Sequence, residues 1–457
     1  MVDPRASRGK RQTTADGFPY PTDDDPWGPS RGFRNPTDGS PWDLFRPSAP
    51  PETGPVDDPV CLLPCPPAGR AARCRLNANR RVEAENRMGT FSRKVGRVVD
   101  CHCHVWGLER VEKLRAVRRD VGLDAMSIAC IVNPRTGSGI GEGLCAKAGE
   151  PEAFYCFGGL NHAGAEGGGQ LVAAPLAEQV DRMLATGADG VKLIEAKPTS
   201  RQKLPFALDG DYYRGFFARA EELAVPILWH VADPEEFWDP HRLPDWAARH
   251  HWGYGPDDVA KEQLYREVEA VLARHPHLRV VFAHFYFLSA DLPRARRFLA
   301  EHPAVRIDLA PGVEFLFNLS ARPDEARAFF IDHADRIVFG TDIGAGQTTT
   351  AAGARAWMVG RFLETADTFH PPADADELLE PGSEKEIVGL DLPAEVLEKI
   401  YHANFESFAT PRPRPVDLAA AVALCRDHAA LAANLSGTPA EDTEAAHCAA
   451  ALAAAGR

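Results

Sequence analysis

The sequence lacks the features that mark several common classes of protein. No run of eighteen apolar residues occurs, so we expect no transmembrane helix and no membrane partner. The N-terminal stretch MVDPRASRGKRQTTADGF has no apolar core of the kind that a secretory signal peptide carries. The formal net charge of −14 disfavours a nucleic-acid partner, because such a surface needs a basic stripe. With 44% hydrophobic and 25% charged residues, the composition indicates a soluble globular protein.

Cysteine is too sparse, and too often apolar in its surroundings, for a disulfide framework. Ten cysteines occur in 457 residues, several of them in strand-like contexts such as SIACIV and AFYCFGG. We therefore expect reduced thiols and a cytoplasmic location. Cys61, Cys65 and Cys74 are close in sequence, but no nearby histidine supplies a fourth ligand, which disfavours a zinc site there.

The composition divides the chain into three parts. Residues 1–95 are predicted to be a mostly disordered extension, because the first 70 residues hold 15 of the 38 prolines and have little to bury. Met88 lies just before the first predicted strand, so we hypothesise that the native protein begins there, which an intact mass would test. Residues 411–457 are Ala-rich and predict a helical tail for packing or oligomer contacts.

Residues 96–410 alternate between short apolar strands and amphipathic helices, which is typical of βα units and a parallel sheet. Eight strands over about 250 residues predict an α/β fold of the (β/α)8 TIM-barrel type. An open doubly wound sheet is the alternative, but it would favour a Gly-rich phosphate loop after the first strand, and none is present. The predicted strands are 97–105, 125–132, 153–160, 190–197, 225–232, 279–287, 305–312 and 336–344.

The first predicted strand, in VVDCHCHVWG, carries alternating ligand-type side chains. Residues two apart in a strand share a face, so Asp100, His102 and His104 are expected on the barrel interior. Cys101 and Cys103 are expected on the opposite face, under the helices. Two imidazoles in register on an interior face are suited to gripping one cation.

Later strands end in matching groups. His230 ends the fifth predicted strand, the sixth carries His284, and the eighth ends in Asp342, before a Gly-rich turn. Active sites of TIM barrels are built from the C-terminal ends of strands. A site rich in nitrogen and oxygen ligands suits zinc, or manganese or another first-row divalent ion.

This ordered pattern resembles the amidohydrolase superfamily. It is D-x-H-x-H, then a histidine on each of two later strands, then G-T-D on an eighth. The resemblance is strongest to the amidohydrolase-2 branch, which contains hydrolases and decarboxylases of the amino-carboxymuconate-semialdehyde and γ-resorcylate types. It covers residues from about 97 to about 410 and includes the segment KIYHANFESFA.

The resemblance implies roles for these residues. His102, His104, His230 and Asp342 would be the ligands of one divalent metal ion, and Asp342 would also accept a proton from the attacking water. His284 would act beside the metal as an acid or base, or as an electrostatic partner of the oxyanion. Two ions per chain would be the alternative, and would draw His284 and Lys192 into a second site.

Four residues are candidates for binding substrate. Lys192, on the fourth predicted strand, lies near the substrate in this branch. Arg135, in the turn after the second strand, would meet a substrate carboxylate, with an exposed structural arginine as the alternative. Glu314 follows the seventh strand, and Trp252 belongs to a long aromatic loop at residues 233–258 that is either a lid or a packed excursion.

These observations favour a metal-dependent hydrolase that uses an activated water on an amide, ester or lactone. The first alternative is a non-oxidative decarboxylase of an aromatic or unsaturated carboxylic acid on the same site. The second is a non-catalytic metal-binding barrel, which the complete ligand set disfavours. The expected partners are a small-molecule substrate and, in a possible homo-oligomer, further copies of the chain.

Overall fold

The computed structural model describes residues 94–165 and 171–456. The predicted disorder of the N-terminal extension, its cysteines and the hypothesis about Met88 lie outside these residues. The strands are β1 (Val99–His104), β2 (Ala125–Ala129), β3 (Phe154–Gly159), β4 (Gly190–Ala196), β5 (Pro226–Val231), β6 (Arg279–Phe282), β7 (Val305–Asp308), β8 (Ile337–Val338), β9 (Ile343–Gly344), β10 (Thr368–Phe369) and β11 (Ile387–Val388).

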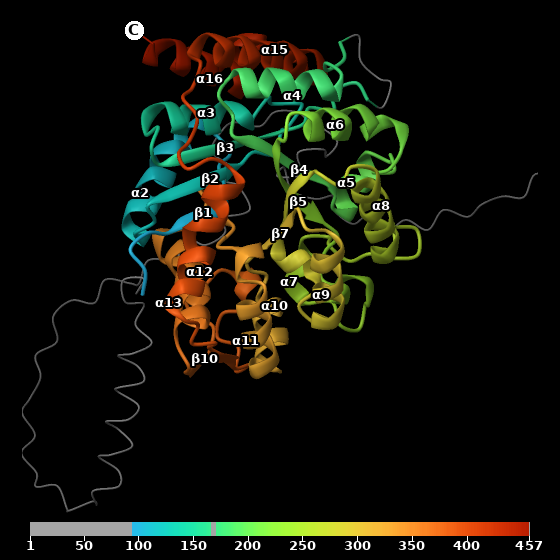
Figure 1. The fold of residues 1–457 in the computed structure, drawn as a ribbon. Helices are drawn as coiled ribbons and strands as arrows, with labels where there is room; N and C mark the ends of the chain where they lie inside the picture. Colours follow the sequence, from blue (N-terminus) through green and yellow to red (C-terminus); the bar gives the residue numbers. More distant parts are fainter. Residues whose placement is uncertain (1–93, 166–170, 457) are drawn as a thin grey trace, which may run out of the picture.

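Helices separate the strands of the main sheet and follow it (Figure 1). The α-helices are α2 (Val111–Val121), α3 (Ile140–Gly149), α4 (Leu176–Ala185), α5 (Pro198–Lys203), α6 (Asp211–Glu222), α7 (Asp245–Arg249), α8 (Lys261–Arg274), α9 (Leu292–Glu301), α10 (Val313–Ser320), α11 (Pro323–Asp332), α12 (Thr349–Glu364), α13 (Ala394–Glu398), α14 (Asn404–Phe408), α15 (Leu418–Ser436) and α16 (Glu444–Ala455). Short 3₁₀ turns include η3 (Glu235–Trp238) and η4 (His284–Phe287), and a π-helical turn, η7 (Lys399–Ala403), joins α13 to α14.

The main sheet is a parallel barrel of the TIM type, as the alternating pattern predicts. Its nine strands run in the order β8-β7-β6-β5-β4-β3-β2-β1-β9. Since β8 and β9 are two halves of the eighth predicted strand, the first half pairs with β7 and the second with β1. The N–H of Asp342 in the gap between them donates to the carbonyl of His102 at 2.8 Å. The eighth strand thus joins the two edges of the sheet.

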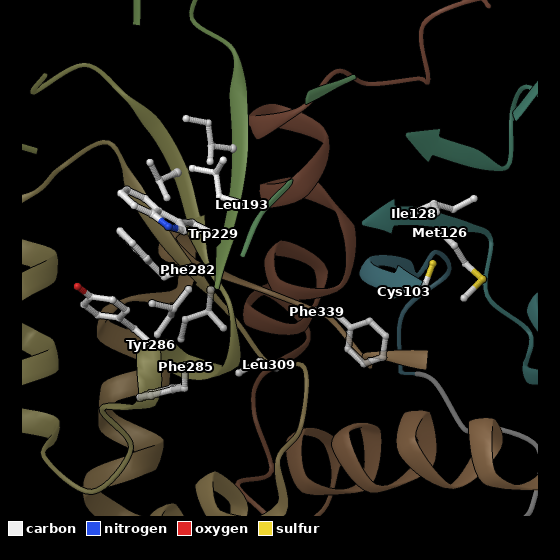
Figure 2. Packing of buried hydrophobic residues seen from close by; sticks show 14 of the residues in the cluster. Cys103, Met126, Ile128, Leu193, Trp229, Phe282, Phe285, Tyr286, Leu309 and Phe339 are labelled. Atoms are coloured by element: carbon white, nitrogen blue, oxygen red, sulfur yellow. The ribbon is translucent and has the colours of Figure 1, made fainter. Parts of the chain in front are cut away.

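Two apolar layers lie on opposite faces of the strands. The layer between strands and helices includes Cys103, Ile128 and Trp229, part of which Figure 2 shows. The other layer lies inside the barrel and draws on alternate positions of the strands, such as Val99, Leu228 and Val281, together with Phe405 and Phe408 of α14. Strand alternation therefore decides which residues reach the interior.

The prediction that both cysteines of the first strand face the helices is wrong for one of them. Cys103 lies in the helix-facing layer, where its Sγ donates to the Ser127 carbonyl at 3.1 Å. Cys101 belongs to the interior layer, with its Sγ 4.0 Å from Asp308 Oδ2. The register between β1 and β2 shifts between Asp100 and Cys103, and such an irregularity breaks the strict alternation of side chains.

The Ala-rich end of the chain is helical, as predicted. Helices α15 and α16 pack against each other and against α3, beside α4 (Figure 1). Gly141 of α3 lies under α16 so closely that a β-carbon on it would come within 2.7 Å of Cys448 Cβ. Of the described helices, α15 is the one long and apolar enough to cross a membrane by length and composition. Its residues Ala421, Leu424, Cys425 and Leu431 are instead buried in this packing.

Candidate metal centre

His102 lies near the end of β1, and both of its ring nitrogens have partners. Its Nδ1 is 2.8 Å from Asp308 Oδ2, at the end of β7. Its Nε2 is 3.0 Å from the Nζ of Lys192 in β4. The carboxylate of Asp308 accepts a hydrogen bond, so Nδ1 carries the ring hydrogen in the neutral imidazole. The lone pair on Nε2 therefore points into the barrel.

His104, two residues later, faces Asp342. Its Nδ1 is 2.6 Å from the carbonyl oxygen of Ala129, which can only accept, so this nitrogen also carries the hydrogen. Its Nε2 is 3.1 Å from Asp342 Oδ1. In the neutral ring, a lone pair thus faces a carboxylate oxygen across a hydrogen-bond distance. Such a pair is attractive only when a cation, either a proton or a metal ion, lies between its members.

His230 and His284 form a second pair of this kind. His230, in β5, has its Nε2 2.9 Å from the carbonyl of Ala232 and 3.2 Å from Asp233 Oδ1, and both of these atoms accept. The Nδ1 of His284 is 3.0 Å from the carbonyl of Ala310. The remaining nitrogens, Nδ1 of His230 and Nε2 of His284, are 3.2 Å apart. Both carry lone pairs in the neutral rings, so this contact too is suited to a cation.

His284 does not lie in a strand, contrary to the sequence prediction. Strand β6 ends at Phe282, and residues 284 to 287 form the turn η4, in which His284, Phe285, Tyr286 and Phe287 all have positive φ. Residues other than glycine rarely adopt this left-handed backbone conformation, because it costs free energy. The N–H of His284 donates to Asp308 Oδ1 at 2.7 Å, which helps to hold the turn in place.

Burial keeps three of the histidines, His102, His230 and His284, neutral. Removal from water lowers the pKa of His230 and of His284 to about 4, and that of His102 well below its ordinary value. Burial also lowers the pKa of Lys192 to about 8. At pH 7 these three rings therefore present unprotonated nitrogens, and the Lys192 side chain remains mostly charged.

Asp342 remains ionised and partly accessible. Burial raises the pKa of this carboxyl, but the contact with His104 and the positive charge of Arg355 outweigh that effect and hold the pKa well below its ordinary value. Arg355 of α12 lies with Nη1 3.9 Å from Asp342 Oδ2 and is held by Asp376 through Nε at 2.6 Å. The Asp342 side chain is 21% exposed, against 1% for His102. The centre therefore opens to solvent at Asp342.

The donor set fits a divalent metal ion. Among the described residues, His102, His104 and Asp342 offer ligand atoms that all lie within 4.8 Å of one another. Imidazole nitrogens and a carboxylate oxygen suit zinc and other first-row divalent ions. His230 lies one step away: its ring is 4.8 Å from that of His284, which is 5.2 Å from that of His102, centroid to centroid. The structure thus gathers all four predicted ligands and His284 at one end of the barrel.

The predicted substrate residues lie in different surroundings. Lys192 faces the centre directly. Glu314, in α10, has a buried Oε1 without a hydrogen-bond partner among the described residues, and burial raises its pKa to about 8. The backbone N–H of Arg135 bonds Asn133 Oδ1 at 3.0 Å, and no described ion pair joins its guanidinium to the centre. Its neighbour Gly137 packs against Ala445 of α16.

Trp252 lies on the long segment between β5 and α8, residues 232–260, which we call the β5–α8 loop. This loop has its own aromatic cluster, in which Phe237 and Tyr254 are buried and Trp252 packs against them. The Nζ of Lys197, just after β4, lies 4.3 Å from the centroid of the Trp252 ring. Lys197 also binds both oxygens of Asp233, at 2.7 and 2.8 Å. Lys197 therefore contacts both the β5–α8 loop, at Trp252, and Asp233, the carboxylate next to His230.

Several residues of the centre escaped the sequence analysis. Asp308, within the seventh predicted strand, bonds both His102 and the backbone of His284. The alternation of β7 and its position at the strand end could have indicated this role. Asp233 directly follows the fifth predicted strand and was equally visible. Arg355 could not have been found, since its contact depends on where α12 packs.

One family model and several solved structures are similar to this chain. A family model described as amidohydrolase matches residues 99–405. Solved structures similar to this chain include a TIM-barrel protein from Bordetella bronchiseptica (16% identity, 71% of this chain and 99% of that chain, TM-score 0.43) and a putative amidohydrolase from Staphylococcus aureus (16%, 69% and 99%, 0.43). A third is 2,6-dihydroxybenzoate decarboxylase in complex with 2,6-dihydroxybenzoate (15%, 69% and 99%, 0.43). No curated protein matches the chain. Since the family model covers well over half of the sequence, the chain belongs to the amidohydrolase family.

Proposed function

We propose that this protein is a metal-dependent hydrolase that cleaves an amide, ester or lactone bond in a small molecule. The observation that carries the proposal is the direction of the four histidine rings. Each has one nitrogen held by a fixed acceptor, and each turns its other nitrogen inward. Together with the Asp342 carboxylate, these nitrogens make a set of donors that suits a bound divalent cation.

His102, His104, His230 and Asp342 would hold one divalent ion, with zinc as the first choice and manganese as an alternative. When bound, such an ion lowers the pKa of a coordinated water toward neutrality and polarises the substrate carbonyl. The centre's opening at Asp342 is consistent with water and substrate arriving from that side.

Asp342 is placed to take the proton of the attacking water. Its carboxylate is ionised, and the Arg355 guanidinium, 3.9 Å away, favours an orientation in which one oxygen remains turned toward the histidines. The proton would then pass to the leaving group, as in general acid–base catalysis.

His284 is better suited to proton transfer than to direct stabilisation of an oxyanion. Its pKa of about 4 leaves it neutral at pH 7, and its Nε2 lone pair faces inward. A lone pair repels an oxyanion, so His284 would have to accept a proton before it could assist one. This supports the acid–base role among the two that the sequence analysis considered.

A non-oxidative decarboxylase is the second candidate, and Lys192 is the observation that favours it. A buried side chain that is mostly ammonium at pH 7 faces the centre 3.0 Å from His102 Nε2, where it would attract a substrate carboxylate. The same cation would serve an acidic substrate in hydrolysis, so Lys192 alone does not decide between the reactions.

The test is a metal-loaded preparation screened against aromatic carboxylic acids in one panel and amides, esters and lactones in another. We expect turnover in the second panel, with loss of at least about a thousandfold in the variant Asp342→Asn, as for removal of a central catalytic group. Release of carbon dioxide from the first panel, without hydrolysis, would replace the proposal by the decarboxylase. Full metal occupancy with no turnover in either panel would favour a non-catalytic barrel.

We also propose a cytoplasmic location. The described cysteines, Cys101, Cys103, Cys130, Cys145, Cys156, Cys425 and Cys448, are all free thiols, which supports a reducing compartment. Fractionation of the source cells would test this.

A further inference from the structure

In each of the four histidines, one ring nitrogen points away from the centre and donates to a fixed acceptor; we call it the outer nitrogen. The outer nitrogen of His230, Nε2, has different acceptors from those of the other three. The outer nitrogens of His104 and His284 donate to backbone carbonyls, and that of His102 donates to the carboxylate of Asp308 within the barrel. The Nε2 of His230 instead faces a carbonyl and a side chain that both follow β5, at Ala232 and Asp233. The backbone of Ala232 has a positive φ of 64°, and this turn brings Asp233 back onto the ring.

Asp233 is buried, 2% exposed, and has partners from three parts of the chain. Lys197, after β4, binds both of its oxygens. The hydroxyl of Tyr254, in the β5–α8 loop, donates to Oδ2. His230 reaches Oδ1 at 3.2 Å. The carboxylate therefore connects the end of β4, the end of β5 and the loop above them.

We propose that Asp233 is a positioning residue of the metal centre, held by Lys197 and Tyr254, which acts with the Ala232 carbonyl to fix the His230 ring with Nε2 as the N–H and Nδ1 as the inward lone pair. The inference rests on the proposed function for its consequence, namely metal binding. The tautomer itself is a property of the chain without metal. An acceptor on the outer nitrogen of a metal-ligating histidine fixes its tautomer and orientation, and removing such partners typically weakens metal binding by about 10- to 100-fold.

The loop is part of this arrangement because Tyr254 belongs to it. Tyr254 is 5% exposed and packs on Trp238, with ring centroids 4.7 Å apart. The ammonium of Lys197, which holds the same carboxylate, lies over Trp252. The carboxylate of Asp233 therefore contacts both the β5–α8 loop and the His230 ring, so the position of the loop and the orientation of the ring depend on the same group.

The experiment compares four variants with the wild type in two measurements. Asp233→Ala removes the carboxylate, Asp233→Asn keeps an oxygen acceptor, and Tyr254→Phe removes only the loop's hydroxyl. The matched control is Tyr212→Phe, which removes another tyrosine hydroxyl, bonded to His162 Nδ1 at 2.8 Å. The first measurement is the ¹⁵N shift of the His230 ring nitrogens in metal-free, histidine-labelled protein. The second is the zinc dissociation constant by chelator competition.

We expect wild-type His230 to show one protonated and one unprotonated nitrogen, with Nε2 protonated. Asp233→Ala leaves the Ala232 carbonyl as an acceptor, so it should add a minor fraction of the other tautomer and raise the zinc dissociation constant by about 10- to 100-fold. Asp233→Asn should retain the tautomer and most of the affinity, Tyr254→Phe should show a smaller change in the direction of Asp233→Ala, and Tyr212→Phe should match the wild type. Thermal unfolding of each variant separates these changes from loss of the fold.

Wild-type shifts and affinity in folded Asp233→Ala would overturn the proposal. Should that variant not fold, unchanged shifts and unchanged zinc affinity in Tyr254→Phe would overturn it as well. A wild type that binds no divalent ion would refute the proposed function, but the metal-free shifts would still decide the role of Asp233. The two failures are therefore distinguishable.

Discussion

The Nδ1–H of His102 donates to Oδ2 of Asp308 at 2.8 Å, across the barrel interior from β1 to β7. The other oxygen of Asp308 accepts the N–H groups of His284, at 2.7 Å, and of Ala310, at 3.1 Å. One carboxylate thus orients a proposed metal ligand and anchors the left-handed turn that carries a proposed acid–base residue. Burial raises the pKa of Asp308 to about 6, so it is mostly ionised at pH 7.

Replacing Asp308 by asparagine should therefore disturb both histidines. Both oxygens of Asp308 accept, and an amide offers one acceptor and one donor, so one of the contacts becomes donor against donor. We expect the zinc dissociation constant of Asp308→Asn to rise by about 10- to 100-fold and the free energy of unfolding to fall by about 1–3 kcal/mol. Asp332→Asn, which removes only an exposed partner of Arg296, is the control and should leave both values unchanged.

Substitution of His102 and substitution of His284 should have different effects on zinc binding. His102→Ala removes a proposed ligand and should abolish stoichiometric zinc binding and turnover together. His284→Asn should largely spare zinc binding and lower kcat, by about 100- to 10,000-fold if His284 is the acid–base group. Metal analysis after dialysis, with single-turnover rates, measures both. Loss of zinc from His284→Asn would instead assign His284 to the ligands and reopen the two-metal alternative.

Lys192 should compete with a metal ion for His102. Its ammonium lies 3.0 Å from the nitrogen that a metal would need, and like charges repel strongly in a buried site. We expect Lys192→Met to bind zinc more tightly than the wild type at pH 7, by roughly tenfold or less. Because the pKa of Lys192 is about 8, the wild type loses this charge as the pH rises through 8. The difference between the two proteins should therefore shrink by pH 9, and a constant difference would contradict the explanation.

A single methyl group added between α3 and α16 should lower the free energy of unfolding. A β-carbon on Gly141 would lie 2.7 Å from Cys448 Cβ, so one of the helices must move. We expect Gly141→Ala to lower the free energy of unfolding by about 1–3 kcal/mol. Gly353, in α12, has open space around the same position, and Gly353→Ala should stabilise by about 0.5–1 kcal/mol. Urea unfolding of both variants tests the pair, and destabilisation of equal size in both would refute the packing argument.

Glu142 lies outside the metal centre, and its protonation should make the free energy of unfolding depend on pH. This side chain is fully buried at the start of α3, and burial raises its pKa from 4.5 to about 7. Between these two values the unfolded chain has lost the proton and the folded chain keeps it, so stability falls as the pH rises from about 4.5 to 7 and is constant above. The shift corresponds to about 3 kcal/mol. Glu142→Gln, which does not titrate, should lose this part of the slope in urea unfolding at pH 5 and 7.5.

Much of the fold follows from the order of residues alone. Each of the eight predicted strands contains a strand of the barrel, because each apolar run must be buried on both faces, which leaves little choice of partner. The convergence of His102, His104 and Asp342 follows in turn, because the C-terminal ends of parallel strands meet at one end of a barrel.

The local geometry could not be obtained in the same way. Cys101 lies in the interior layer with Val99, whereas Cys103 faces the helices, because the register of β1 shifts between Asp100 and Cys103; nothing in an alternating sequence indicates where alternation will fail. His284 lies in a left-handed turn although HFYF has the composition of a strand, because bonds from Asp308 and the packing of η4 outweigh local preference. Arg355 reaches Asp342 only through the placement of a helix that follows the barrel.

The division of the eighth strand has a consequence for how the protein assembles. Asp342 lies in the gap between β8 and β9, and its N–H bonds the carbonyl of His102 where the last strand meets the first. These two residues come together only when the barrel closes, since contacts distant in sequence carry a large loop-closure entropy and form late. Occupancy of the centre would therefore report a closed barrel, and an ion bound there would slow the opening of the barrel at this junction.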